Sequence, residues 1–229
     1  MYGCPVSDTP RLRHVRTFKP RKGRITSRQQ RALDHRADPV LCVTGSRLDL
    51  ETEFPACGDV VLEIGFGTGT ATSVMARAAP HEAIIAVDVH TPGVGDLLNA
   101  IHDQQLSNVR VIEGDALDFA ASRLPPNSLA GIRTYFPDPW PKARHHKRRI
   151  IQTQHVNTLT PFVRPGGFWH LATDIDSYAE QMLQVFGDSD EWNGGIVERP
   201  VWRPVTKYEA IALAVPRQIT DLIYVKSSS

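Results

Sequence analysis

The sequence has few cysteines and no long apolar run, and both absences narrow what the protein can be. Only three of the 229 residues are cysteine (Cys4, Cys42 and Cys57), and no two of them form a Cys-x-x-Cys pair. A disulfide framework or a zinc site is therefore not expected, and a reducing, cytoplasmic setting fits best. No apolar run approaches the length of a membrane span, so we expect no membrane association.

The small net charge of +1 conceals an uneven distribution of charged residues. Between Arg11 and Arg36 there are ten Lys or Arg residues against one acid, Asp34. Five more cations and no acid lie between Lys142 and Arg149. Such concentration attracts phosphates and indicates a nucleic-acid partner.

The chain divides into a basic beginning and a region where strands alternate with helices. Residues 1–25 are basic, rich in Pro and Gly and without apolar periodicity, so we expect them to be mobile when unbound; a merely solvated tail is the alternative. We expect a partly flexible N-terminal extension over residues 1–50 and one domain over 51–229. Its alternation of strands and helices predicts an α/β fold, a mainly parallel sheet covered on both faces. The expected strands cover residues 60–64, 83–89, 108–113, 130–136 and 167–173; the expected helices cover 70–79, 146–159 and 175–186; segments 208–215 and 222–225 are expected to form a final antiparallel hairpin.

A glycine-rich turn follows the first expected strand. Gly65, Gly67 and Gly69 would let the backbone approach a ligand and leave helix N-terminal amides free. The dinucleotide fingerprint would need a further glycine at Thr70. Glu63 precedes the glycines, where a carboxylate would repel a pyrophosphate but suits the cationic amino-acid part of S-adenosylmethionine.

Two more acids end expected strands, at the edge where open α/β sheets bind ligands. Asp88 could accept hydrogen bonds from ribose hydroxyls, and Asp115 from an adenine amino group. Taken alone, Glu63 or Asp115 could equally be a cap or turn residue. The ordered set is typical of the Rossmann-like core of class I S-adenosylmethionine-dependent methyltransferases.

The run from Tyr135 to Arg149 combines one acid, several aromatic rings and a dense cationic cluster. Asp138 lies between Pro137 and Pro139, which favour an extended loop. A fixed acid suits chemistry on a base, and the cations suit phosphates. The Trp140 ring either supports a base or anchors the loop. The adjacent histidines in this run lie among cations, so we expect no metal site.

The segment Phe-Pro-Asp-Pro-Trp-Pro-Lys with the cations that follow it, residues 136–149, closely resembles that of bacterial tRNA (guanine-N7-)-methyltransferases. Residues 23–26, 172–174 and 203–209 agree as well, and the resemblance runs from about residue 11 to 225. It implies methyl transfer from S-adenosylmethionine to N7 of a guanine in the tRNA variable loop. The tail departs from the family pattern after Glu209, although the spacing from Glu209 to Asp221 is kept.

The resemblance also implies roles for individual residues. Positions that match cofactor contacts are Glu63, Asp88, Asp115 and Asp138, beside the glycines Gly65, Gly67 and Gly69. Positions that match substrate contacts are Lys142, Asp174, Thr206, Lys207, Tyr208 and Glu209. The RNA-contacting stretch matches Arg144, His145, His146, Lys147, Arg148 and Arg149.

Guanine N7 carries a lone pair and no proton, so no general base is needed. Most of the catalysis should come from holding N7 in line with the methyl carbon and the sulfur of the cofactor. Asp138 is then expected to orient the base and stabilise developing positive charge, while Glu209 and Asp174 would accept from its Watson–Crick edge. An RNA or DNA amino-group methyltransferase is one alternative, but Asp138-Pro139-Trp140 lacks the second proline typical of those enzymes. A non-catalytic RNA-binding protein that retains the fold is another. The sequence does not decide between a monomer and a homodimer.

Overall fold

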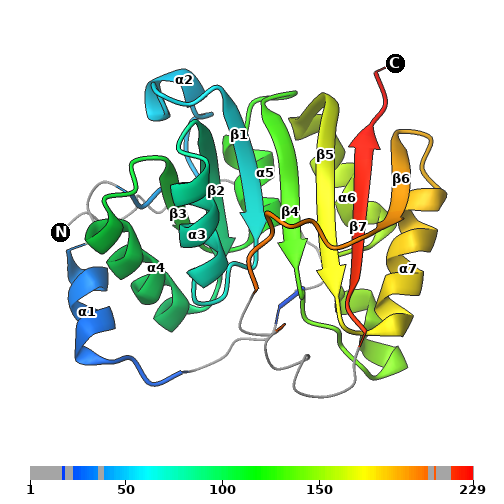
Figure 1. Ribbon diagram of the computed structural model, residues 1–229, viewed down its shortest axis with the longest axis horizontal. Coiled ribbons are helices and arrows are strands. Elements are labelled where there is room, and N and C mark those ends of the chain that lie inside the picture. The colour runs from blue at the N-terminus through cyan, green and yellow to red at the C-terminus, as the bar shows by residue number, and fades with distance from the viewer. Residues whose placement is uncertain (1–16, 19–22, 36–38, 206–208, 210–217, 229) are drawn as a thin grey trace.

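A computed structural model describes residues 17–18, 23–35, 39–205, 209 and 218–228 as one sheet with helices against it (Figure 1). The seven strands lie in the order β3-β2-β1-β4-β5-β7-β6. The first five pair in parallel, and β7 pairs antiparallel with β5 and β6. The strands are β1 (Asp59–Ile64), β2 (Glu82–Asp88), β3 (Val109–Glu113), β4 (Leu129–Tyr135), β5 (Val163–Thr173), β6 (Trp192–Val197) and β7 (Thr220–Lys226).

Helices cover both faces of the sheet, as the alternating pattern predicts. On one face, α3 (Thr70–Ala78) and α4 (Thr91–Gln104) pack on β2 and β3, and α1 (Ser27–Asp34) packs on α4. On the other face, α5 (Ala116–Arg123), α6 (Thr153–Leu159) and α7 (Asp176–Gly187) enclose the larger core. The remaining short elements are α2 (Leu50–Glu53), η1 (Ala143–Arg148) and η2 (Thr160–Phe162).

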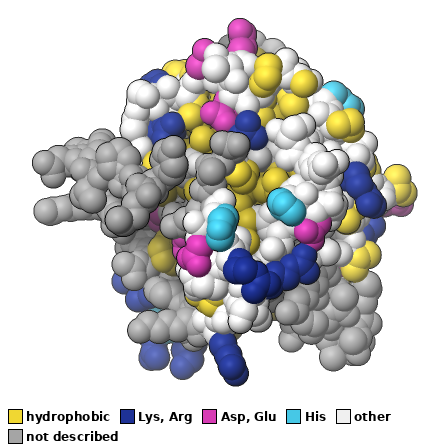
Figure 2. Space-filling view, turned by 90° about the vertical axis from the view of Figure 1, so that its left-hand side faces the viewer, with side chains coloured by type: hydrophobic (Ala, Val, Ile, Leu, Met, Phe, Trp, Pro, Cys, Tyr) yellow, Lys and Arg dark blue, Asp and Glu magenta, His cyan; other side chains and the backbone are white. Residues whose placement is uncertain are grey.

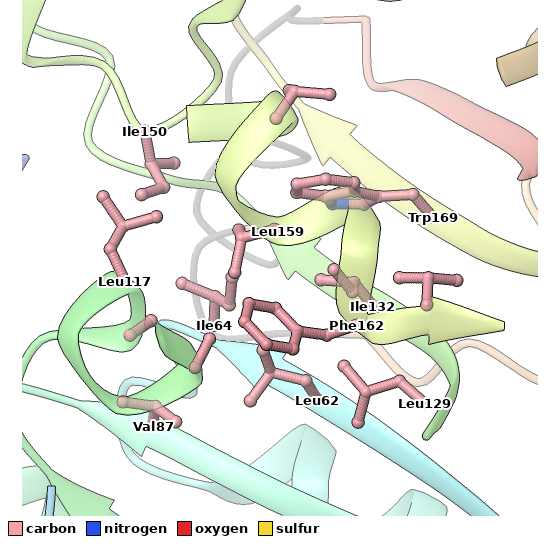
Figure 3. Packing of buried hydrophobic residues seen from close by; sticks show 14 of the residues in the cluster. Leu62, Ile64, Val87, Leu117, Leu129, Ile132, Ile150, Leu159, Phe162 and Trp169 are labelled. Carbon is pink, nitrogen blue, oxygen red and sulfur yellow. The ribbon is translucent and has the colours of Figure 1, made fainter. Parts of the chain in front are cut away.

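The larger core packs aliphatic side chains of the strands against those of the covering helices (Figure 3). Leu62, Ile132 and Trp169 come from neighbouring strands and are fully buried. At one end of this core Leu117 and Ile150 lie near Ile64 (Figure 3). The packing therefore continues to the carboxyl ends of the strands, where a ligand would bind.

Among the helices that the structure describes, none of α1 to α7 packs on β4, β5 and β7 on the α3/α4 side of the sheet. Instead the segment of residues 198–205 leaves β6 and crosses in front of these strands (Figure 1). Trp202 packs there against His170 of β5 and Arg133 of β4. This crossing segment, residues 198–205, is buried at Arg203, and Glu209, a few residues later in the chain, is buried as well.

The strand predictions for 60–64, 83–89, 108–113, 130–136 and 167–173 are confirmed, as are the helices over 70–79 and 175–186. The single helix expected over 146–159 is wrong. A 3-10 helix ends at Arg148 and α6 begins at Thr153, because the Arg149–Gln152 stretch is extended and holds buried contacts with α7. The antiparallel pairing at the C-terminal end of the sheet is confirmed. However, β7 pairs with β5 and β6, and β6 was not among the expected strands. The segment 208–215, apart from Glu209, lies outside the described residues.

The expectation of reduced cysteines holds for Cys57, which is free, and is wrong for Cys42, which is disulfide-bonded. Within the described part of the chain, no helix is long and apolar enough to span a membrane. Over the same residues, no three His, Cys, Asp or Glu side chains are grouped as a metal site would require.

Asn108 joins the end of α3 to the start of β2. Its buried amide donates to the carbonyl oxygens of Ala76 at 3.0 Å, Ala79 at 3.3 Å and Glu82 at 2.8 Å. These include carbonyls that a helix end leaves without intrahelical partners. We expect Asn108→Ala to lower the free energy of unfolding by about 2 kcal/mol, because it leaves buried carbonyls unpaired. Chemical denaturation measures this value.

The matched control for this substitution is Asn157→Ala, since Asn157 is an exposed residue of α6. The control should change the free energy of unfolding by less than about 0.5 kcal/mol. Equal effects of the two substitutions would contradict the role assigned to Asn108.

Candidate functional site

A pocket opens at the carboxyl ends of β1, β2 and β4. Its lining contains five residues of the expected cofactor set: Gly65, Gly67, Asp88, Asp115 and Asp138. Apolar side chains complete the wall, including Phe18, Ile64, Val87 and Ile150. The structure therefore brings together acids that are separated by up to 50 positions in the sequence.

The glycine turn is held by Asp88 and by α4. The Gly67 amide donates to Asp88 Oδ2 at 2.7 Å, and the His90 amide donates to Oδ1 at 2.9 Å. Burial raises the pKa of Asp88, and these two hydrogen bonds oppose the rise. A Cβ on Gly93 would lie 1.9 Å from the Gly67 oxygen, so only glycine lets α4 approach the turn this closely.

Gly65 and Gly69 differ in what they face. Gly65 has φ +81° and lines the pocket, and a Cβ placed on it would meet no atom within 4 Å. Gly69 also has positive φ, but a Cβ there would lie 2.7 Å from Leu97 of α4. Gly69 thus serves the packing of α3 on α4, and it is not among the residues that line the pocket.

Glu63 is buried next to this turn, only 3 % exposed. Burial raises the pKa of its carboxyl group to about 7, while the Thr72 side chain and Arg133 oppose the rise. Its Oε2 atom has no hydrogen-bond partner among the described residues. A buried carboxyl oxygen without a hydrogen-bond donor would stabilise a cationic group placed beside it.

Asp115 caps a helix and also lines the pocket. Its Oδ1 accepts a 2.8 Å hydrogen bond from the Leu117 amide at the start of α5. The reading of Asp115 as a cap residue is therefore confirmed, and its place in the lining is compatible with a second contact.

The Asp138 loop, residues 136–141, is held in an uncommon conformation. Phe136 and Trp140 have φ values of +49° and +44°, which bulky side chains rarely adopt. Such a conformation persists only where surrounding contacts enforce it. Trp140 Nε1 donates to the Thr17 carbonyl at 3.1 Å, and Arg149 Nε donates to the Pro139 carbonyl at 2.8 Å. These contacts fix the loop that carries Asp138.

The cationic run after this loop divides into exposed and buried members. Lys142, Arg144 and Lys147 are exposed, and His145, His146 and Arg148 are half-buried. The Arg148 guanidinium lies 5.2 Å from the centre of the Trp140 ring. Desolvation lowers the pKa of His145, and the neighbouring cations lower it further.

Arg149 corrects the expectation for the end of this run. It is 1 % exposed, and its guanidinium donates to Pro139, to Ser177 and, at 2.7 Å, to Gln181. Its charge lies over the Tyr178 ring at 4.5 Å. Because these groups enclose it, Arg149 fastens the Asp138 loop to α7 and cannot also reach an RNA phosphate.

The expected substrate residues are placed in part. Asp174 follows β5 and is half-buried. Glu209 is 1 % exposed and accepts hydrogen bonds from Arg199 and Arg203. Thr206, Lys207, Tyr208 and the altered tail at 210–217 lie outside the described residues.

Several residues of the pocket wall were not expected from the sequence, and the two that lie farthest from the others along the chain are Thr17 and Phe18. They belong to the basic beginning of the chain, and only the reading of Trp140 as a loop anchor hinted at such a contact. Farther along, α1 presents the exposed side chains of Arg28 and Arg31. Figure 2 shows the side of the molecule where α1 and α4 lie, with Lys and Arg side chains gathered beside histidines and acids.

Solved structures with a similar fold include a 16S rRNA methyltransferase, KamB, with a TM-score of 0.59 and 15 % identity, covering 80 % of this chain and 95 % of that one. The antibiotic-resistance methyltransferase Kmr gives a TM-score of 0.54 at 16 % identity, covering 81 % and 95 %. At this identity the likeness establishes the fold alone. The fold is that of class I S-adenosylmethionine-dependent methyltransferases, as the sequence predicts.

Sequence relatives identify the family. Residues 58–222 match a family model described as "Putative methyltransferase". A tRNA (guanine-N(7)-)-methyltransferase of Streptomyces avermitilis is 46 % identical over 219 residues, 93 % of this chain and 75 % of that protein. One of Nitrosospira multiformis is 41 % identical over 218 residues, 93 % and 95 % of the two chains. This chain, with its pocket of strand-end acids, belongs to the tRNA (guanine-N(7)-)-methyltransferase family.

Proposed function

We propose that this enzyme transfers the methyl group of S-adenosylmethionine to N7 of a guanine in the variable loop of tRNA. The observation that carries the proposal is the juxtaposition of Asp138 with Asp88 and Asp115 in one pocket, directly before the exposed cations at 142–147. Asp138 would then lie between the site for the methyl donor and the segment 142–147 that binds phosphates. The names of the relatives support guanine N7 in tRNA as the acceptor.

The residues present fit S-adenosylmethionine. The open space in front of Gly65 leaves room for a ligand against the backbone. The buried Glu63 carboxyl suits its ammonium group, and Asp88 suits its ribose hydroxyls. Phe18 and Val87 offer an apolar wall to its adenine. When bound, the cofactor supplies a methyl group on a positively charged sulfur.

The protein's own residues would act by orientation and electrostatics. The lone pair of guanine N7 needs no deprotonation, so the site must hold the base in line with the methyl group. Asp138 can do so from a loop whose backbone is fixed by Trp140 and Arg149. Positive charge moves to the purine during the reaction, and a fixed carboxylate stabilises it there.

We further propose a cytoplasmic enzyme, since that is where its tRNA substrate is available. Residues 1–50 would form the N-terminal extension of a methyltransferase domain over 51–229. The packing of α1 on α4 and the place of Thr17 in the pocket wall support a contribution of this extension to the site.

Asp138→Ala tests the proposal when compared with the unaltered chain. Incubation with unmodified tRNA and S-adenosylmethionine, followed by nucleoside mapping, should give N7-methylguanine in the variable loop. Asp138→Ala should reduce this rate at least about 100-fold, because the orienting carboxylate is gone, while tRNA retention on a filter persists. Asp188→Ala, at an exposed acid after α7, is the control and should match the unaltered chain.

Two outcomes would contradict the proposal in different ways. N6-methyladenine as the sole product would favour an amino-group methyltransferase, and absence of S-adenosylmethionine binding by calorimetry would favour a non-catalytic RNA-binding protein. Full activity of Asp138→Ala would remove that residue from the mechanism.

The raised pKa of Glu63 predicts proton release on cofactor binding. In the free protein this carboxyl has a pKa of about 7, above its usual 4.5, so at pH 6 it is mostly protonated. An ammonium group beside it favours the ionised form, so binding at pH 6 should release up to about one proton. Calorimetry in two buffers of different ionisation enthalpy measures this number. Glu63→Gln should abolish the release, and an unchanged release in that variant would assign it to another group.

The same group contributes to stability with a defined sign. Its folded-state pKa is raised, so its contribution is fully present below pH 4.5 and is lost as the pH rises through about 7. In the free protein, the free energy of unfolding of Glu63→Gln should therefore fall less between pH 4.5 and about pH 7 than that of the unaltered chain.

The division of the cationic run predicts different effects for its members. Arg144→Ala with Lys147→Ala should weaken tRNA binding and lower the slope of log K against log salt by about 1 per lost phosphate contact. Arg149→Ala should instead lower the free energy of unfolding, because its buried partners lose their donor. Binding titrations at several salt concentrations and chemical denaturation separate the two. An unchanged salt slope in the double variant would remove Arg144 and Lys147 from the phosphate contacts.

A further inference from the structure

A buried chain of charged and polar groups lies under the crossing segment, residues 198–205. Its centre is Arg203, whose side chain is fully buried. Arg203 donates to both oxygens of Asp221 at 2.7 and 2.9 Å. It also donates to both oxygens of Glu209, at 2.6 and 3.2 Å. One guanidinium therefore joins β7 to Glu209.

Arg199 holds Glu209 from the other side. Its Nε donates to Glu209 Oε1 at 2.6 Å, and its Nη2 donates to the Arg203 carbonyl at 2.6 Å. Its side chain is 35 % exposed, whereas that of Glu209 is 2 % exposed. Glu209 is thus clamped between one buried arginine and one at the surface.

The other end of the chain of groups reaches the strands beside the pocket. His170 Nε2 lies 2.8 Å from Asp221 Oδ1, and the Tyr135 hydroxyl lies 2.9 Å from His170 Nδ1. Desolvation lowers the pKa of His170, which favours the neutral ring, while Asp221 opposes this shift. In a neutral ring, one nitrogen donates and the other accepts, which matches a donor at Nε2 toward Asp221 and an acceptor at Nδ1 toward Tyr135. Burial raises the pKa of Asp221, but the hydrogen bonds from His170 and Arg203 outweigh it and hold this pKa below its usual value. The clamp, which consists of Arg199, Arg203 and Glu209, is therefore connected through Asp221, His170 and Tyr135 to β7, β5 and β4.

Two of these strands lead to acids that the sequence assigns to the site. Tyr135 ends β4 and is followed directly by the Asp138 loop, and Asp174 follows β5. The Arg203 guanidinium lies 5.6 Å from the centre of the Tyr135 ring and 5.8 Å from that of Phe136. Phe136 in turn lines the pocket. Arg203 thus lies between Glu209 and the start of the Asp138 loop.

We propose that Arg199 and Arg203 are positioning residues that fix the Glu209 carboxylate relative to the Asp138 loop for binding of the guanine. The inference rests on the proposed function and deepens it. Burial of an ion pair is weak evidence for stability, since desolvation offsets the attraction. The planar fork of arginine defines the direction of a carboxylate, which a lysine does not. The two arginines therefore define the orientation of the Glu209 carboxylate.

Direct RNA contact does not explain both arginines. The Arg203 side chain is 0 % exposed and cannot reach a phosphate. Arg199 is partly exposed, so its variant needs a salt titration. If Arg199 acts through Glu209, Arg199→Gln leaves the salt slope of tRNA binding unchanged.

The test uses Arg199→Gln and Arg203→Lys in the full chain with unmodified tRNA. Each should lower kcat/KM for tRNA at least about tenfold, while the Kd for S-adenosylmethionine stays within about twofold of the unaltered value. Arg199→Gln changes a partly exposed side chain, so folding is retained even if Arg203→Lys unfolds. Arg110→Lys is the matched control. Arg110 lies in β3, at the opposite edge of the sheet from β7 and β6, and forms a half-buried pair with Glu53 of α2, so its variant should keep the unaltered kcat/KM.

A double-mutant comparison separates positioning from a structural role. If Arg199 acts through Glu209, then Arg199→Gln combined with Glu209→Gln loses no more activity than Glu209→Gln alone. Additive losses, or a folded Arg199→Gln variant with unaltered kcat/KM, would overturn the inference while N7-methylguanine formation by the unaltered chain upholds the proposed function. Absence of N7-methylguanine with the unaltered chain would overturn both.

Discussion

The parallel pairing of β1 with β2 and β4 is the constraint on which the site depends. The register pairs Ile64 with Val87 and Glu63 with Arg133, so these strands end side by side. Backbone hydrogen bonds continue the alignment past the strand ends, from Gly65 to Val87 at 2.8 Å and from Gly114 to Asp88 at 2.9 Å. A shift of one position would turn each terminal acid to the other face. The pocket is thus a consequence of sheet register.

This dependence explains why much of the fold and the cofactor site could be predicted from the sequence. A strand in a covered parallel sheet is a short apolar run, and the residue after it faces the ligand edge. Asp88 and Asp115 could be placed by this local rule, and both line the pocket. The glycine turn followed the same rule, except that Gly69 contacts Leu97, a residue 28 positions later that no local pattern indicates.

What could not be predicted depends on contacts between distant segments. Arg149 stands in a run of cations and looks like its neighbours in the sequence, yet α7 supplies the carbonyl and amide oxygens that bury it. Because Arg149 turns inward with extended backbone, the helix expected over 146–159 is interrupted there. Thr17 joins the pocket because Trp140 binds its carbonyl, a contact across 123 positions. Composition can indicate a phosphate-binding run, but it cannot tell which member turns inward.

Two of the buried arginines, Arg149 and Arg203, hold segments that carry acids. Arg149 holds the Asp138 loop, and Arg203 holds Glu209; both are about 1 % exposed. Burial of a guanidinium is costly unless its donors are matched, and here carboxylates, carbonyls and an amide oxygen receive them. Loops that carry functional acids usually lack the packing that fixes strands. A planar cation packed against each acid-bearing segment supplies that missing rigidity, so Asp138 and Glu209, 71 positions apart in the sequence, lie on segments that are each held by a buried guanidinium.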